Sequence, residues 1–213
     1  MNKLLTEFIG TFFLFLTITM TVSAGTLLAP IAIGSVLMVM VYMGGHISGA
    51  HYNPAVSLAA WMRGLMTQGD MIKYMGVQLL GAIAAGLVGL HLSGGNLVVP
   101  AAAEGMIVEA VIAEILFTFA LVLVILNVAA TEATAGNSYF GLAIGFTVAA
   151  GAFAVGDVSG GAFNPAVGLG PAIADAFTGD AGHLADAWLY LVGPFAGGAL
   201  AAYVYGIQNK PSE

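Results

Sequence analysis

The sequence has no cysteine and very little charge. Only 4 Lys and Arg and 11 Asp and Glu occur among 213 residues, which is 7%, against about 25% in an ordinary soluble domain. The missing thiols exclude disulfides, thiolate metal sites and a cysteine nucleophile. The net charge of -7 and the few scattered basic residues exclude electrostatic binding of nucleic acid. Hydrophobic residues make up 60% of the chain, so it lacks the polar side chains that would cover a soluble globule.

What the chain does have is long runs without charge. Residues 8–62 contain no Asp, Glu, Lys or Arg, and residues 133–174 contain only Asp157. One membrane helix needs about 20 residues. The first run is therefore roughly 15 residues longer than two transmembrane helices require, and the second half has a similar surplus. We therefore expect an all-α membrane protein with six transmembrane helices, at about residues 4–24, 30–46, 71–92, 107–129, 138–157 and 183–207.

Two segments of the chain repeat one another. SGAHYNPAVSL at 48–58 and SGGAFNPAVGL at 159–169 share the pattern SGxx[YF]NPAVxL, and EFIGTF at 7–12 matches EILFTF at 114–119. The period of about 110 residues divides one domain, residues 1–213, into a first repeat of about 1–100 and a second of about 105–213. Three spans per repeat start the second repeat on the opposite side, which predicts an inverted repeat. The repeat also favours a retained first helix over the alternative, a cleaved signal peptide.

The positions of the charges predict an orientation. With six spans, all four basic residues fall on one side, which is the cytoplasm by the positive-inside rule. The sequence thus predicts a multi-pass protein of the cell membrane, with its N- and C-termini in the cytoplasm. The basic residues are Lys3, Arg63, Lys73 and Lys210, and the acidic residues expected on the other side are Glu104, Asp175, Asp180 and Asp186.

Each Asn-Pro-Ala triplet is a helix start, because Asn is a strong N-cap and Pro favours the first helical position. The triplets, Asn53, Pro54 and Ala55 and then Asn164, Pro165 and Ala166, open stretches at 55–62 and 166–176 that are too short to span a bilayer. Glycine-containing stretches at 44–52 and 156–163 precede them. Irregular backbone at membrane depth is tolerated where it is buried in protein or lines a water-filled cavity. We therefore predict two re-entrant half-helices whose N-termini meet at the midplane.

Such a pore carries out no reaction. A neutral molecule exchanges its water shell for backbone carbonyls and for the N–H donors of Asn53 and Asn164, while two helix N-termini, each carrying about half a positive charge, disfavour cations. The expected partners are water, small neutral solutes and the lipid bilayer, without nucleic acid. Neither a cofactor nor a metal ion is needed, and the chain is not expected to be an enzyme.

These residues resemble the major intrinsic proteins, the aquaporin and aquaglyceroporin family, over nearly the whole chain. The resemblance rests on both NPA motifs, on Glu7, Gln78 and Glu114, on HISGAH at 46–51 and on VGP at 192–194. It implies an aquaporin-like fold with an hourglass pore in each subunit, and a homotetramer. In most of the family an Arg follows the second NPA and narrows the outer filter, whereas this chain has Val167. The other filter positions, carried over from the family, are Ile33, Ala152 and Gly161.

The resulting filter has no charge and little bulk. We therefore expect a wide apolar outer mouth and passive conduction of water together with peroxide, urea, ammonia or glycerol. Glu7 and Glu114 are interpreted as acceptors that hold the re-entrant loops in shape, with a proton relay as the alternative. His46 is expected to order its loop, with gating of the cytoplasmic vestibule as the alternative.

Three other functions are alternatives to a channel. A secondary transporter also uses inverted repeats and broken helices, but it needs a titratable or ion-binding group at the midplane, where this chain places two Asn. An intramembrane enzyme is disfavoured because the sequence has no HExxH or GxSxG motif. A closed, purely structural member of the family would be distinguished from a channel by a flux measurement.

Overall fold

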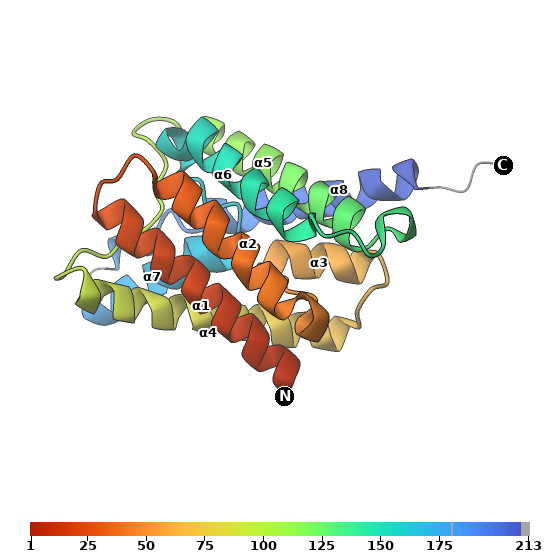
Figure 1. Ribbon diagram of the computed structural model, residues 1–213. Helices are drawn as coiled ribbons and strands as arrows, with labels where there is room; N and C mark the ends of the chain where they lie inside the picture. Colours follow the sequence, from red (N-terminus) through yellow and green to blue (C-terminus); the bar gives the residue numbers. More distant parts are fainter. Residues whose placement is uncertain (180, 210–213) are drawn as a thin grey trace.

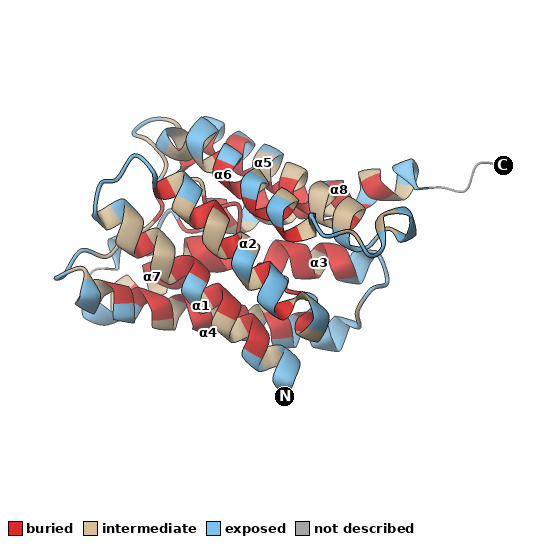
Figure 2. Cartoon of the chain, viewed as in Figure 1, coloured by how far each residue is buried: buried red, intermediate tan, exposed pale blue. Residues whose placement is uncertain are grey.

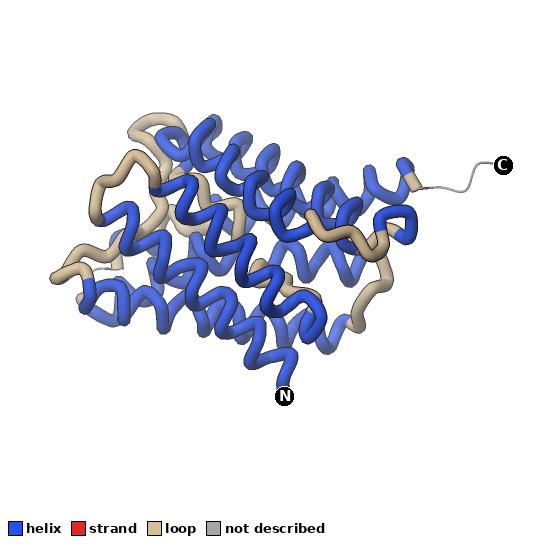
Figure 3. Tube along the Cα trace, in the orientation of Figure 1, coloured by secondary structure: helices blue, strands red, loops and turns tan. Residues whose placement is uncertain are grey.

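The computed structural model describes residues 1–179 and 181–209, and in these residues every regular element is helical (Figures 1 and 3). Asp180 and Lys210, which the orientation prediction used, lie outside the described residues. The α-helices are α1 Asn2–Ser23, α2 Ala29–Ser48, α3 Pro54–Met62, α4 Gln68–Leu92, α5 Ile107–Ala129, α6 Phe140–Ser159, α7 Pro165–Thr178 and α8 Leu189–Gln208, with short 3-10 turns η1 Glu132–Thr134 and η2 Gly182–Leu184.

Six segments are long and apolar enough to cross a membrane, which confirms the expected number of spans. They are α1, α2, α4, α5, α6 and the segment Gly182–Gln208. Exposed stretches of the helices lie on the outside of the bundle (Figure 2). Large apolar side chains such as Phe13, Leu116 and Phe153 are among the exposed residues, as is expected where a protein faces lipid. The chain is a multi-pass membrane protein.

Two boundaries differ from the prediction for local reasons. Helices α2 and α6 continue to Ser48 and Ser159, so the irregular backbone covers only 49–53 and 160–164 rather than the longer stretches expected. Glycines within a helix do not end it. Each helix ends where Gly49 and Gly160 adopt left-handed φ of +90° and +78°, a conformation that favours glycine. The last span, expected to be one helix from residue 183, begins as η2 and becomes α-helical only at Leu189.

The packing of the two halves is symmetrical. α1 packs on α4 as α5 packs on α8, and α1 packs on α2 as α5 packs on α6. Between the halves, α4 packs on α7 as α8 packs on α3, while α2 meets α6. The short helices α3 and α7 enter from opposite ends of the bundle (Figure 1). These principal helix pairs of one repeat therefore have counterparts in the other, as an inverted repeat requires.

The two ends of the bundle carry different charges. Lys3, Arg63 and Lys73 lie at the end of the bundle where α1 begins and α8 finishes, and we call it the basic end. Glu104, Asp157, Asp175 and Asp186 lie at the opposite end, where α1, α4 and α6 finish, and we call it the acidic end.

The close helix crossings depend on glycine residues, which have no side chain to separate the two backbones. A Cβ on Gly34 of α2 would lie 2.6 Å from the Gly145 carbonyl oxygen of α6. A Cβ on Gly81 of α4 would lie 2.7 Å from the Phe8 carbonyl oxygen of α1, and the equivalent Gly197 of α8 meets the Ile115 carbonyl of α5. Without a hydrophobic driving force between helices in lipid, this backbone approach supplies much of the packing.

Gly81→Ala is expected to destabilise the protein by about 1–3 kcal/mol, because the new methyl meets rigid backbone and must push α1 away from α4. Gly76→Ala on the same helix is the matched control, since a Cβ there meets nothing within 4 Å. The midpoints of thermal unfolding in detergent measure both effects. Equal midpoints for the two variants would contradict the importance of this crossing.

Candidate functional site

The first irregular segment, residues 49–53, is held by a buried carboxylate. Glu7 on α1 is fully buried, and four donors surround its two oxygens. Each oxygen of the carboxyl group therefore accepts two hydrogen bonds. On Oε1 the donors are the Ser48 hydroxyl at 2.6 Å and the His51 N–H at 3.0 Å, and on Oε2 they are the Tyr52 N–H at 2.7 Å and Gln78 Nε2 at 2.8 Å.

The second irregular segment, residues 160–164, is held in the same way with one donor fewer. The donors to the buried Glu114 are the Ser159 hydroxyl at 2.8 Å and the Ala162 N–H at 3.0 Å on Oε1, and the Phe163 N–H at 2.6 Å on Oε2. Tyr74 and Tyr190 brace the two segments, donating to the carbonyls of Ser48 and Ser159 at 2.9 and 2.6 Å. Gln78 lies four residues after Tyr74 and donates to Glu7, whereas the equivalent position after Tyr190 is Pro194, which has no side-chain donor for Glu114. The two repeats therefore differ at this position.

The two NPA asparagines both cap a helix and join the loops. Asn53 Oδ1 accepts from the Ala55 N–H at 2.8 Å, and Asn164 Oδ1 accepts from the Ala166 N–H at 2.9 Å. The amide nitrogens of the two asparagines form hydrogen bonds across the pseudo-twofold axis, each to a carbonyl of the other repeat. Asn53 Nδ2 donates to the Phe163 carbonyl at 2.8 Å, and Asn164 Nδ2 donates to the Tyr52 carbonyl at 2.9 Å. Each amide retains a second N–H without a partner among the described residues.

These crossed bonds depend on unusual backbone. Tyr52 and Phe163 have φ of +49° and +48°, a left-handed conformation that large side chains rarely adopt. Their N–H groups are bound by the carboxylates of Glu7 and Glu114, and their carbonyls accept from the opposite asparagine. These buried hydrogen bonds compensate for the strain. The result places the N-termini of α3 and α7 against each other in the middle of the bundle.

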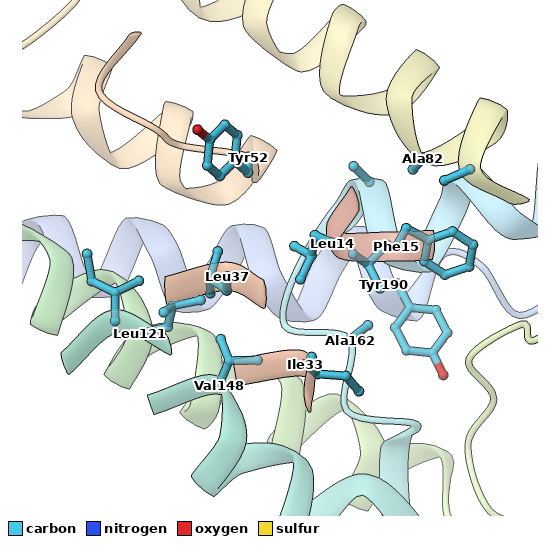
Figure 4. Packing of buried hydrophobic residues seen from close by; sticks show 14 of the residues in the cluster. Leu14, Phe15, Ile33, Leu37, Tyr52, Ala82, Leu121, Val148, Ala162 and Tyr190 are labelled. Atoms are coloured by element: carbon cyan, nitrogen blue, oxygen red, sulfur yellow. The ribbon is translucent and has the colours of Figure 1, made fainter. Parts of the chain in front are cut away.

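A cavity lies on each side of this meeting point. The acidic-end cavity has a volume of about 420 Å³ and is lined mainly by aliphatic side chains. Among them Ile33 and Leu37 from α2, Leu121 from α5 and Val148 from α6 belong to one cluster (Figure 4). The basic-end cavity has a volume of about 660 Å³ and includes Lys3, Asp70 and Lys73.

Three residues line both cavities: His51, Val56 and Ile125. We call them the collar. His51 is fixed in it by a contact of 3.0 Å between Nδ1 and Ser57 Oγ, and Ser57 in turn accepts from Gln78 Nε2 at 3.1 Å. The collar is therefore a shared wall at the junction of the two cavities, and its imidazole is held by the polar network around Glu7.

A model of the family described as "Major intrinsic protein" matches residues 1–205. The chain belongs to the major intrinsic protein family. This family consists of passive membrane channels and is not a class of enzyme, so the protein is a channel.

Similar proteins in this family come from plants and bacteria. The chain is 36% identical over 223 residues to Aquaporin NIP1-1 of Zea mays, covering 99% of this chain and 77% of that protein. It is 38% identical over 223 residues to Glycerol uptake facilitator protein-like 6 of Lactiplantibacillus plantarum, covering 99% of each. The solved aquaglyceroporin from Plasmodium falciparum superposes with a TM-score of 0.82 at 23% identity, over 96% of this chain and 94% of that one. At this identity the likeness shows the shared all-helical fold.

In this major intrinsic protein, the four positions expected to form the filter all line the acidic-end cavity. They are Ile33, Ala152, Gly161 and Val167, from α2, α6, the second loop and α7. Val167 is only 2% exposed, so its side chain is packed into the wall rather than hanging into solvent. The structure thus brings together four residues that are far apart in the sequence, in a cavity with a wide aliphatic surface.

His46 does not join the predicted site, and two parts of the cavity lining were not predicted from the sequence. His46 is exposed, and its side chain has no hydrogen bond with any described residue. The first loop is held instead by Glu7, which Gln78 supports, and by Tyr74 at the Ser48 carbonyl. Sequence reasoning did not find the collar or the wall formed by residues 98–101, which line the acidic-end cavity. Residues 98–101 can approach the backbone of Gly160 because glycine has no side chain. A Cβ on Gly160 would lie 2.9 Å from the Ala101 nitrogen. No motif in the sequence indicates this contact.

Proposed function

We propose that this chain conducts water and small uncharged solutes such as peroxide, urea, ammonia or glycerol passively across the cell membrane. The observation that carries the proposal is the pair of cavities that adjoin at the collar, with Asn53 and Asn164 facing each other in the lining of the acidic-end cavity. The free N–H of each asparagine gives a passing solute a donor beside the mainly aliphatic wall of the acidic-end cavity. A neutral solute loses little free energy when it exchanges water for this lining, whereas a cation is repelled by the partial positive charges of two helix N-termini.

The carboxylates of Glu7 and Glu114 act as positioning groups in this proposal. Both are buried behind the loops and line neither cavity, and their oxygens accept hydrogen bonds from loop N–H groups. A proton relay would need them to face the passage. The alternative, a secondary transporter, would have to use His51, which is the titratable group of the collar.

A flux panel on proteoliposomes tests the proposal. Stopped-flow light scattering is expected to show water, urea and glycerol permeability above that of empty vesicles, unchanged by an imposed proton or sodium gradient. Water flux with complete exclusion of urea, peroxide and glycerol would overturn the broad solute range. Flux that follows a gradient would favour the transporter.

We further propose that the collar, rather than the filter positions, sets the size limit. The filter positions belong to one open cavity, whereas the two cavities are divided at His51, Val56 and Ile125. Ile125→Ala is expected to raise glycerol permeability about three- to tenfold, because it removes three carbons from the dividing wall. Ile18→Ala, which lines only the acidic-end cavity, is the matched control and is expected to change it less than twofold. Equal effects of the two variants in the same stopped-flow assay would contradict this placement.

Orientation and assembly complete the proposal. By the positive-inside rule the basic end faces the cytoplasm, so the acidic end faces outward and both termini are proposed to be cytoplasmic. Protease accessibility of a C-terminal tag in intact and opened cells tests the orientation. We propose a homotetramer, which the mass of the purified protein in detergent, measured by light scattering, would support or refute.

A further inference from the structure

Among the described residues that line the acidic-end cavity, Asp157 has the one formally charged side chain. It lies in the last turn of α6, two residues before the helix ends at Ser159, and it is exposed. No described residue forms a hydrogen bond or ion pair with it, whereas Asp175 at the same end is bound by His183 Nδ1 at 2.6 Å. A carboxylate at a helix C-terminus is also repelled by the helix dipole. Asp157 is therefore an uncompensated negative charge.

The surroundings of Asp157 strengthen this negative potential. The Ala103 N–H donates to the Val158 carbonyl at 3.0 Å, which brings the neighbouring acidic Glu104 to the same rim. Every described Lys and Arg lies at the basic end. A mouth lined by charge of one sign concentrates counter-ions. The acidic-end cavity therefore attracts cations at its rim.

The interior of the same cavity suits an apolar body. Its wall includes Leu14, Ile144 and Val148 from three helices together with residues 98–101 of the connecting loop. The volume of about 420 Å³ is in the range of small-molecule sites. A sodium or potassium ion would have to give up its hydration shell to enter such a surface, but a cation whose charge is covered by methyl groups would not.

We propose that the acidic-end cavity binds compact organic monocations of the quaternary ammonium class, with the charge beside Asp157 and the methyl groups against the aliphatic wall, and that the bound cation blocks conduction. It cannot pass because the collar and the N-termini of α3 and α7 lie ahead of it. The block rests on the proposed channel function, whereas the binding does not.

The experiment uses tetramethylammonium chloride, which carries a permanent charge and does not cross lipid. Water permeability of proteoliposomes is measured with the salt on both sides, against sodium chloride of equal osmolality. Half-maximal block is expected at roughly 1–30 mM, the affinity that burial of a few methyl groups beside an exposed charge supports. Asp157→Asn is expected to raise this concentration about threefold or more. Asp186→Asn, at the same end but outside the cavity lining, should leave it unchanged.

Binding is measured separately by saturation-transfer NMR on the tetramethylammonium methyl signal with protein in detergent. Binding without any water flux would leave the site standing and refute the channel proposal. Water flux without block up to about 100 mM, or an Asp157→Asn protein blocked at the same concentration as the unchanged one, would overturn the site. Equal block by tert-butanol would show that the cavity takes neutral apolar molecules and that the carboxylate has no role.

Discussion

Glu7→Gln is expected to reduce water conduction at least about tenfold and to lower the free energy of unfolding by about 2–4 kcal/mol. The amide keeps one acceptor but places an NH₂ where Oε2 accepted two donors, the Tyr52 N–H and Gln78 Nε2. A buried donor without a partner costs about 1–3 kcal/mol. Tyr52 would then lose the bond that holds its left-handed backbone, and its carbonyl would move away from Asn164.

The measurement is water permeability per reconstituted protein, together with the thermal unfolding midpoint in detergent. Glu114→Gln is the internal comparison. Its NH₂ would face only one donor, the Phe163 N–H, so its loss of stability should be smaller. Glu109→Gln, on an exposed part of α5, should change neither quantity. A Glu7→Gln protein that melts and conducts like the unchanged one would show that the carboxylate does not hold the loop.

Val167→Arg is expected to lower urea and glycerol permeability at least about tenfold while retaining water permeability. Val167 is buried in the wall of the acidic-end cavity, and the other three filter positions leave room for a longer side chain. A guanidinium there adds bulk and five N–H donors to a surface that has little of either. It would also lie in the same cavity as Asp157, which offers it an ion-pair partner.

Stopped-flow uptake of each solute measures the effect. Val167→Met separates size from charge, since its side chain extends into the cavity without carrying donors. If Met lowers urea permeability as much as Arg does, bulk alone narrows the mouth. Solute uptake that Val167→Arg leaves unchanged would count against the assignment of this position to the filter.

The regular elements could be read from the sequence because each has a local cause. Uncharged runs of about 20 residues predict spans, and Asn-Pro predicts a helix start, which the caps on Ala55 and Ala166 show directly. The end of α2 and α6 was less predictable. Several glycines precede each loop, and only the backbone conformation of Gly49 and Gly160 distinguishes the one that ends the helix. The same holds for α8, whose apolar sequence continues upstream into a turn.

The sequence by itself determined the number of spans, the inverted repeat and the family, because these depend on composition, spacing and motifs that are contiguous in the chain. Only the tertiary structure decided how the two loops join through Asn53 and Asn164, where the two cavities divide, and which carboxylate faces the mouth without a partner. Those features arise from contacts between residues about 110 positions apart, such as Asn53 with Phe163. The packing of α2 on α6 and of α4 on α7 sets these distances, and no local pattern in the sequence encodes them.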